Sequence, residues 1–108
     1  MIKRTSLVWK RPELSNAEFR RLWLGEHVAI AKRLRGLREY TIDFVTEGAT
    51  DGLSGVASLW FSSRAELDAA FADPALSSDL IRTRDQFARS VQVLIVDEEI
   101  VVPRRGER

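Results

Sequence analysis

The chain contains no cysteine among its 108 residues, and this absence removes several kinds of site from consideration. Disulfide bonds, thiolate zinc sites and a cysteine nucleophile are all excluded. The single histidine, His27, means that a metal site would have to consist mainly of carboxylates, and no spacing of Asp and Glu residues indicates one. We therefore expect neither a metal ion nor another cofactor.

Long apolar segments are also absent. No stretch approaches the ~20 apolar residues that a membrane-spanning helix needs, and residues 1–10 lack the apolar run of a secretory signal. Hydrophobic residues make up 44% of the chain and charged residues 31%, which is typical of a soluble domain with a real core. We expect a cytoplasmic protein without membrane contact, folded as one domain over residues 1–103 and followed by a flexible basic tail at 104–108.

The net charge of the whole chain is only +1, but the charge is unevenly distributed. Residues 1–38 hold 10 Lys/Arg and 3 Asp/Glu, whereas residues 39–103 hold 4 and 12. A basic half can indicate nucleic-acid binding, yet no platform of interleaved aromatic and basic residues accompanies it. We therefore expect that the basic first helix packs beside the acidic second half and that the protein binds no nucleic acid.

The periodicity of apolar residues and the breakers between them predict strands and helices along the whole chain. Capping-box spacings at Ser15/Glu18 and Ser63/Glu66 mark two helix starts, and Gly36 is placed to end the first helix. The predicted elements are a strand at 2–10, a helix at 15–34, strands at 38–47 and 55–62, a helix at 65–72, one or two helices at 76–89 and a strand at 90–102. This order predicts an α+β fold of the ferredoxin-like βαββαβ type, in which helices cover one face of a four-stranded antiparallel sheet.

The predicted strands carry apolar side chains on both faces. In the second strand Tyr40, Ile42 and Phe44 fall on one face and Val45 on the other, and the third strand is apolar on both faces as well. The helices can cover only one of these faces, and so large an apolar surface is rarely left in water. A second copy of the sheet is the simplest cover, so we expect a two-fold homodimer.

His27 lies in an unusual place within the first predicted helix. At ~3.6 residues per turn, it falls on one stripe with four apolar residues, Phe19, Trp23, Ile30 and Leu34. The imidazole therefore faces the interior or a pocket. It is either a structural histidine, bonded to Tyr40 or to a backbone carbonyl, or a pocket histidine that moves protons.

Several segments together resemble the EthD family. Their order and spacing match over about residues 3–102, and the segments are Phe19-x-x-x-Trp23-x-x-x-His27, Gly36-Leu37-Arg38-x-Tyr40, the strand from Gly55 to Ser63, Asp73-Pro74 and Asp85-x-Phe87. The resemblance implies a ferredoxin-like dimeric α/β barrel. Its better-understood relatives include methylmuconolactone methylisomerase and fungal polyketide dehydratases and decarboxylases.

Two residues carry over from the family as candidate catalytic groups. His27 matches the family's helix histidine, and Tyr40 matches the tyrosine that starts the second strand. In these roles His27 would be the base or acid, and Tyr40 would donate a hydrogen bond to a developing oxyanion. The chain offers no second histidine and no cysteine, both of which the methylisomerase uses around its lactone.

Four further residues are candidates for substrate binding. Trp23, Phe44 and Trp60 would line a cleft that accepts an aromatic compound, or would instead pack in the core and the dimer interface. Asp85 would orient His27 or a substrate hydroxyl, or would instead cap its own helix.

These observations predict a small cofactor-independent enzyme that moves protons. The expected reaction is an isomerisation, cyclisation, dehydration or decarboxylation of an aromatic, lactone or polyketide-like small molecule. One alternative is a cofactor-independent monooxygenase, an oxidoreductase, because other dimeric α/β barrels oxidise reduced aromatics without a metal. Another is a non-catalytic accessory protein that binds a hydrophobic intermediate in a degradation pathway.

Overall fold

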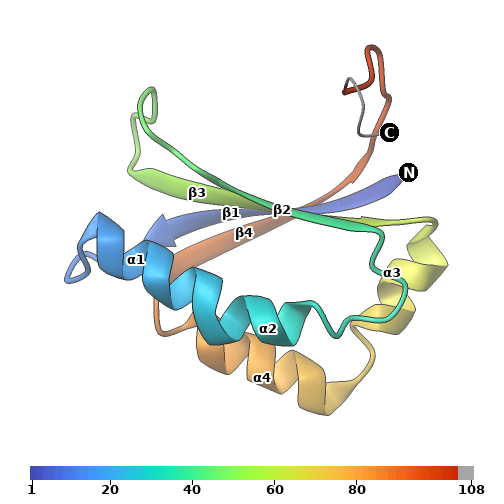
Figure 1. Cartoon of the computed structure of the whole chain (residues 1–108), viewed down its shortest axis with the longest axis horizontal. Helices are drawn as coiled ribbons and strands as arrows, with labels where there is room; N and C mark the ends of the chain where they lie inside the picture. The colour runs from blue at the N-terminus through green and yellow to red at the C-terminus, as the bar shows by residue number, and fades with distance from the viewer. Residues whose placement is uncertain (105–108) are drawn as a thin grey trace.

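A computed structural model describes residues 1–104, which form one antiparallel sheet with helices on one of its faces (Figure 1). The strand order in the sheet is β2-β3-β1-β4. The strands are β1 (Ile2–Lys10), β2 (Glu39–Phe44), β3 (Leu53–Phe61) and β4 (Ala88–Asp97). The helical segments are α1 (Asn16–Leu22), η1 (Trp23–His27), α2 (Val28–Ala31), α3 (Arg64–Ala70) and α4 (Pro74–Arg84). The predicted α+β fold, with its four-stranded antiparallel sheet, is confirmed.

The first helix is not the single unbroken α-helix predicted for residues 15–34. Its middle part, η1, is a π-helical turn in which Gly25 departs from helical geometry (φ −85°, ψ −118°), and α2 ends at Ala31. A π-turn holds more residues per turn than an α-helix, so hydrophobic periodicity alone does not reveal it. Gly36 lies beyond the helix with a φ of 77°, the left-handed conformation that suits a glycine after a helix end.

The helix starts follow the predicted capping chemistry. The Ser15 hydroxyl accepts from the Glu18 backbone N–H at 3.1 Å, and the Glu18 carboxylate accepts from the Ser15 N–H at 2.9 Å, which completes the capping box. Ser63 caps α3 in the same way by accepting from the Glu66 N–H at 3.2 Å. The Asp73 carboxylate caps α4, and Pro74 occupies its first turn.

The last strand ends at Asp97, five residues before the predicted end at residue 102. The Glu98 N–H donates to the Met1 carbonyl at 3.0 Å, and the Glu98 carboxylate accepts from the Trp60 indole N–H at 2.8 Å. Glu98 thus bends over β1 towards β3, and the chain leaves the sheet edge. Val101 is 89% exposed. Of the basic tail expected at 104–108, residues 105–108 lie outside the described part of the chain.

The two faces of the sheet differ in their cover. The helix-facing side chains of β3, including Ala57, Leu59 and Phe61, are buried in the core. Trp60 alternates with these β3 residues and therefore lies on the open face. Leu94 of β4 pairs with Thr5 of β1, and both also lie on the open face. Figure 1 shows the β2–β3 loop and the C-terminal segment projecting from the sheet on the side away from the helices. The open face therefore lies between two projecting segments.

The helices at the start and end of the chain pack against each other, as α2 and η1 both contact α4. One ion pair joins them, between the Arg82 guanidinium and the Glu26 carboxylate at 3.3 Å. Glu26 belongs to the basic half of the sequence (residues 1–38), and Arg82 belongs to the acidic half (residues 39–103). Within residues 1–104, no helix combines the length and the hydrophobicity required to cross a membrane.

Candidate active site

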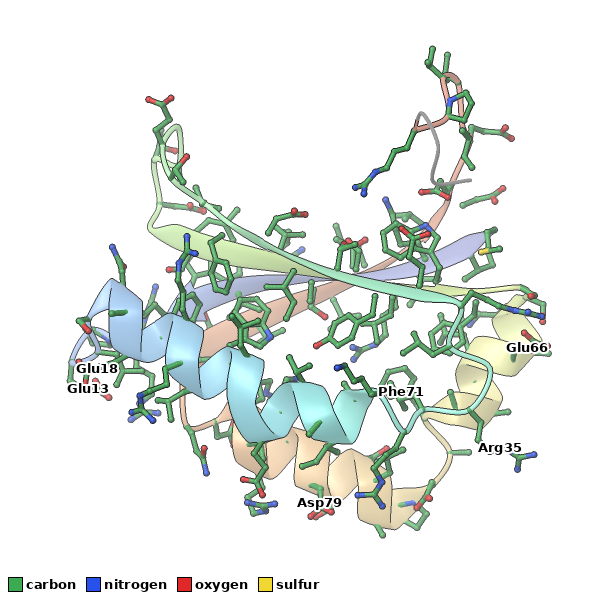
Figure 2. All side chains as sticks on the ribbon, viewed as in Figure 1. Glu13, Glu18, Arg35, Glu66, Phe71 and Asp79 are labelled. Carbon is green, nitrogen blue, oxygen red and sulfur yellow. The ribbon has the colours of Figure 1, made fainter. Side chains whose placement is uncertain are left out.

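A cavity of about 260 Å³ lies between the sheet and the helices. All four strands contribute to its walls, together with η1, α2 and α4. Phe71, which directly follows α3, lies between sheet and helices at one end of this layer (Figure 2). Most of the lining is apolar, and the polar side chains that line it are Arg4, Ser6, His27, Tyr40, Ser77 and Arg84.

A hydrogen bond to Thr83 of α4 holds His27 at the cavity wall. The His27 Nδ1 and the Thr83 Oγ1 are 2.7 Å apart. The Thr83 hydroxyl has one proton, which it donates to the Asp79 carbonyl of its own helix at 2.9 Å. With its proton on this carbonyl, the hydroxyl accepts from His27 Nδ1–H, and we assign the imidazole tautomer on this basis, with the lone pair on Nε2. This arrangement makes Nε2 the nitrogen that can take up a proton.

The surroundings of His27 keep the imidazole neutral. Burial lowers the pKa of His27 from its usual 6.5 to about 4, and the positive charges of Arg84 and Arg4 contribute to this shift. A hydrogen bond to the Leu80 backbone carbonyl acts in the opposite direction. The Phe87 ring meets the imidazole edge to face, with 5.3 Å between the centroids. At neutral pH His27 is thus uncharged, and it is a weak base.

Tyr40 of β2 lines the same cavity and keeps its proton. Burial raises the pKa of the Tyr40 phenol to about 12, and a hydrogen bond with the Trp23 side chain opposes this shift. At neutral pH the phenol is therefore a hydrogen-bond donor. The structure brings Tyr40, His27 and Trp23 to one cavity.

Two arginines give the cavity a positive wall. The Arg4 guanidinium on β1 lies over the Phe71 ring at 4.4 Å, and its Nη1 donates to the Ser6 hydroxyl at 3.4 Å. Burial, followed by the charge of Arg84, lowers the pKa of Arg4, which shows that the two cations are close enough to repel each other. Both remain charged at neutral pH.

The other three candidates for substrate binding lie away from this cavity. Phe44 packs edge to face against Trp23, with 5.6 Å between centroids, and belongs to the core cluster behind it. Trp60 is on the open face of the sheet, in a second depression beside the C-terminal segment. Asp85 caps the end of α4 and pairs with Arg84 at 3.2 Å, with its side chain 61% exposed. Of the four candidates for substrate binding, only Trp23 therefore lines the same cavity as His27.

Sequence reasoning did not single out Thr83, Arg4 or Arg84. Thr83 carries no local signal, because its role depends on the packing of α4 against η1. Arg4 does carry one: it shares a strand face with Ser6 and Val8, and a charged residue on a core-facing position indicates a special environment.

Among residues 1–104, no three His, Asp or Glu side chains gather closely enough to hold a metal ion. The groups that the cavity offers for binding and chemistry are therefore an imidazole, a phenol, two guanidinium groups and two hydroxyls, set in apolar walls.

Comparison with known families gives a match to the model described as EthD domain, over residues 11–90. No curated protein matches the chain. Among solved structures, an ethyl tert-butyl ether d (EthD) family protein from Bacillus halodurans is 14% identical, with a TM-score of 0.75 over 92% of this chain and 100% of that one.

Two other solved structures share the fold. SnoaB from Streptomyces nogalater, described as a cofactor-independent oxygenase, is 14% identical, with a TM-score of 0.68 over 95% of this chain and 97% of that one. A protein of unknown function from Thermobifida fusca, described as dimeric and ferredoxin-like, is 8% identical, with a TM-score of 0.68 over 88% of each chain. These likenesses show a common fold.

Proposed function

Because this chain belongs to the EthD domain family, we propose that it is a small cofactor-independent enzyme that transfers protons on a small, largely apolar molecule bound in the cavity. One observation carries the proposal. His27 and the protonated phenol of Tyr40 line one cavity, and the hydrogen bond between His27 Nδ1 and Thr83 leaves Nε2 as the basic nitrogen in the assigned tautomer.

The proposed reaction starts at a carbon acid next to a carbonyl group. His27 Nε2 takes the proton from carbon, the C–H electron pair forms a C=C bond as the carbonyl π pair moves onto oxygen, and the Tyr40 hydroxyl donates a hydrogen bond to the resulting enolate oxygen. The imidazolium then returns its proton. Delivery to another carbon of the enolate gives isomerisation, and delivery to a departing hydroxyl releases water. In a cyclisation the enolate carbon attacks a second carbonyl carbon of the same molecule, and the proton goes to the new alkoxide.

Solvent exchange tests the proposal on several classes of carbon acid at once. The protein is incubated in D2O with a panel of β-keto esters and butenolides, and deuterium uptake at carbon is followed by NMR. We expect catalysed exchange with at least one compound class and a ~100-fold or larger loss in His27→Gln, because glutamine cannot act as an efficient base. Tyr40→Phe should lose less, since it removes one donor and keeps the ring.

The matched control is Leu24→Gln, which places the same side chain at an exposed position of the same helical segment. It should exchange at the wild-type rate. If His27→Gln exchanges as fast as the wild type, His27 is not the base. The cavity would then support a binding role, in which the protein holds a hydrophobic intermediate without converting it.

A second candidate function is a cofactor-independent oxygenation, favoured by the shared fold with SnoaB. The same base would deprotonate a hydroxylated aromatic, and dioxygen would then oxidise the resulting anion. An oxygen electrode separates the two reactions. Consumption of dioxygen with a hydroxynaphthalene, lost in His27→Gln, would support oxygenation, whereas proton transfer proceeds equally well without dioxygen.

We also propose that the protein acts as a homodimer. The support is the open face of the sheet, which two projecting segments flank (Figure 1), and the dimeric neighbour from Thermobifida fusca. This face carries apolar side chains among polar ones, and the apolar residues include Leu7, Val56, Trp60 and Leu94. The helix-side cavity lies on the other face of each sheet.

A further inference from the structure

The cavity that holds His27 has positive charges in two walls that are far apart in the sequence. Arg4 comes from the first half of β1, and Arg84 comes from the last turn of α4. Both lower the pKa of His27, and Arg84 lowers the pKa of Arg4, so the three groups lie within electrostatic reach of one another. The fold has thus brought two permanent cations and a titratable base around one space.

No carboxylate lines this cavity among the residues that the structure describes. Arg4 forms no ion pair in that part of the chain: its neighbours are the Ser6 hydroxyl and the Phe71 ring. Arg84 pairs with Asp85, which is largely exposed and lies outside the lining. An ion pair in contact with water contributes little, so Asp85 offsets only a part of the positive charge.

Cations in a partly enclosed apolar space are costly unless an anion accompanies them. The remaining walls, among them Trp23, Leu34, Leu80 and Phe87, are apolar. A cavity of 260 Å³ is larger than the ~150 Å³ cavity that can hold benzene, so one or two fused rings fit. Guanidinium groups are well suited to carboxylates, which they bind through paired hydrogen bonds.

We propose that the ligand of this cavity is an aromatic or similarly flat carboxylate, whose ring lies against the apolar walls and whose carboxylate binds Arg4 and Arg84. This proposal deepens the proposed function, on which it rests only for the choice of cavity. It also explains how a weak base becomes effective. Burial is the first cause of the low pKa of His27, and a bound carboxylate offsets the further contribution of the Arg84 and Arg4 charges, so the imidazole gains proton affinity when the substrate arrives.

The test is the binding of 2-naphthoate and of its neutral isostere 2-naphthamide, measured by calorimetry at constant ionic strength. We expect naphthoate to bind wild-type protein at least ~10-fold more tightly than naphthamide. Arg4→Gln and Arg84→Gln should each weaken naphthoate ~10-fold or more and leave naphthamide unchanged, because a hydrogen bond to a charged group is lost in each.

Arg35→Gln is the matched control, since Arg35 is exposed, points outwards from the molecule (Figure 2) and does not line the cavity, while its loss changes the net charge equally. It should leave naphthoate binding unchanged. His27→Gln should keep the preference for naphthoate, so failure of the catalytic proposal is distinguishable from failure of this one. Circular dichroism reports folding of each variant; if Arg4→Gln does not fold, the partly exposed Arg84 carries the test.

Three results would overturn the proposal. The first is equal binding of naphthoate and naphthamide to the wild type. The second is the same loss of naphthoate affinity in Arg35→Gln as in the two cavity variants, which would indicate a general effect of charge. The third is absence of naphthoate binding at millimolar concentration, because a cavity with the unpaired Arg4 and the partly compensated Arg84 should retain an aromatic carboxylate there.

Discussion

At the scale of single residues, we infer that Thr83 sets which nitrogen of His27 holds the proton. We expect Thr83→Val to lower the rate of deuterium exchange about tenfold, since it removes the partner of Nδ1 at 2.7 Å. Thr83→Ser keeps the hydroxyl and should retain most of the activity. Nitrogen-15 NMR of His27 should show mixed tautomers in the valine variant; an unchanged Nδ1–H tautomer there would exclude Thr83 as the positioning residue.

The depressed pKa of His27 also predicts how stability depends on pH. The unfolded chain binds this proton with a pKa near 6.5 and the folded chain with a pKa near 4, so between these values the unfolded state takes up more protons. The free energy of unfolding should therefore fall as the pH is lowered through this window, by about 2 kcal/mol between pH 7.5 and pH 5.

Urea denaturation of wild type and His27→Gln at the two pH values measures this effect. The variant has no group to protonate at this position, so its loss of stability between pH 7.5 and pH 5 should be smaller by about the same ~2 kcal/mol. Equal pH dependence in both proteins would mean that His27 titrates normally in the folded state.

At the scale of elements, the contact between η1 and β3 sets the position of the site. Gly55 of β3 lies under the Trp23 indole, and a Cβ added there would meet the ring atoms Cζ3 and Cη2 of Trp23, the latter at 3.0 Å. Because Trp23 stacks on Phe87 with 5.2 Å between centroids and an interplanar angle of 19°, the indole has little freedom to move.

We therefore predict that Gly55→Ala destabilises the fold by about 1–3 kcal/mol, as overpacking of a core does. Thermal and urea unfolding measure the loss. Trp23→Phe removes the ring atoms in question, so the double variant should lose less stability than the sum of the two single variants. Strict additivity would show that the indole does not limit the space above Gly55.

The π-helical turn is the second feature at this scale. It places Trp23 and His27 at the two ends of one five-residue segment, so that the indole hydrogen-bonds Tyr40 and the imidazole reaches Thr83. π-turns recur at functional sites in proteins, which agrees with the candidate site at this position.

At the scale of the whole molecule, the open face of the sheet is the large surface that no helix of the chain covers. Leu94 on this face is 40% exposed, and the neighbouring segments rise around it on the side away from the helices (Figure 1). The proposed homodimer would bury this face.

We predict that light scattering at micromolar concentration gives about twice the chain mass of 12.3 kDa. Leu94→Glu should shift the protein towards monomer, because a buried unpaired carboxylate is costly in an interface. Leu24→Glu, at a 52% exposed helix position, is the matched control and should leave the dimer intact. A wild-type chain that stays monomeric and folded would refute dimerisation through this face.

The sequence by itself determined the order of elements, the capping of helices at Ser15 and Ser63, and the side of the first helix on which His27 and Trp23 lie. These properties are local, since hydrophobic periodicity and capping chemistry act over a few residues. For the same reason the pattern located the face of β2 that carries Tyr40.

Only the tertiary structure decided which distant residues share the cavity. Thr83 and Arg84 meet His27 because α4 packs against η1, and Arg4 joins them because β1 lies at the centre of the sheet. Asp85 stays outside the cavity because it follows the end of α4 with its side chain exposed, whereas the exclusion of Trp60 follows from strand alternation, which the sequence already contains. Such contacts depend on the packing of whole elements, which no local sequence pattern encodes. They determine which groups surround His27 and how much positive charge the candidate site carries.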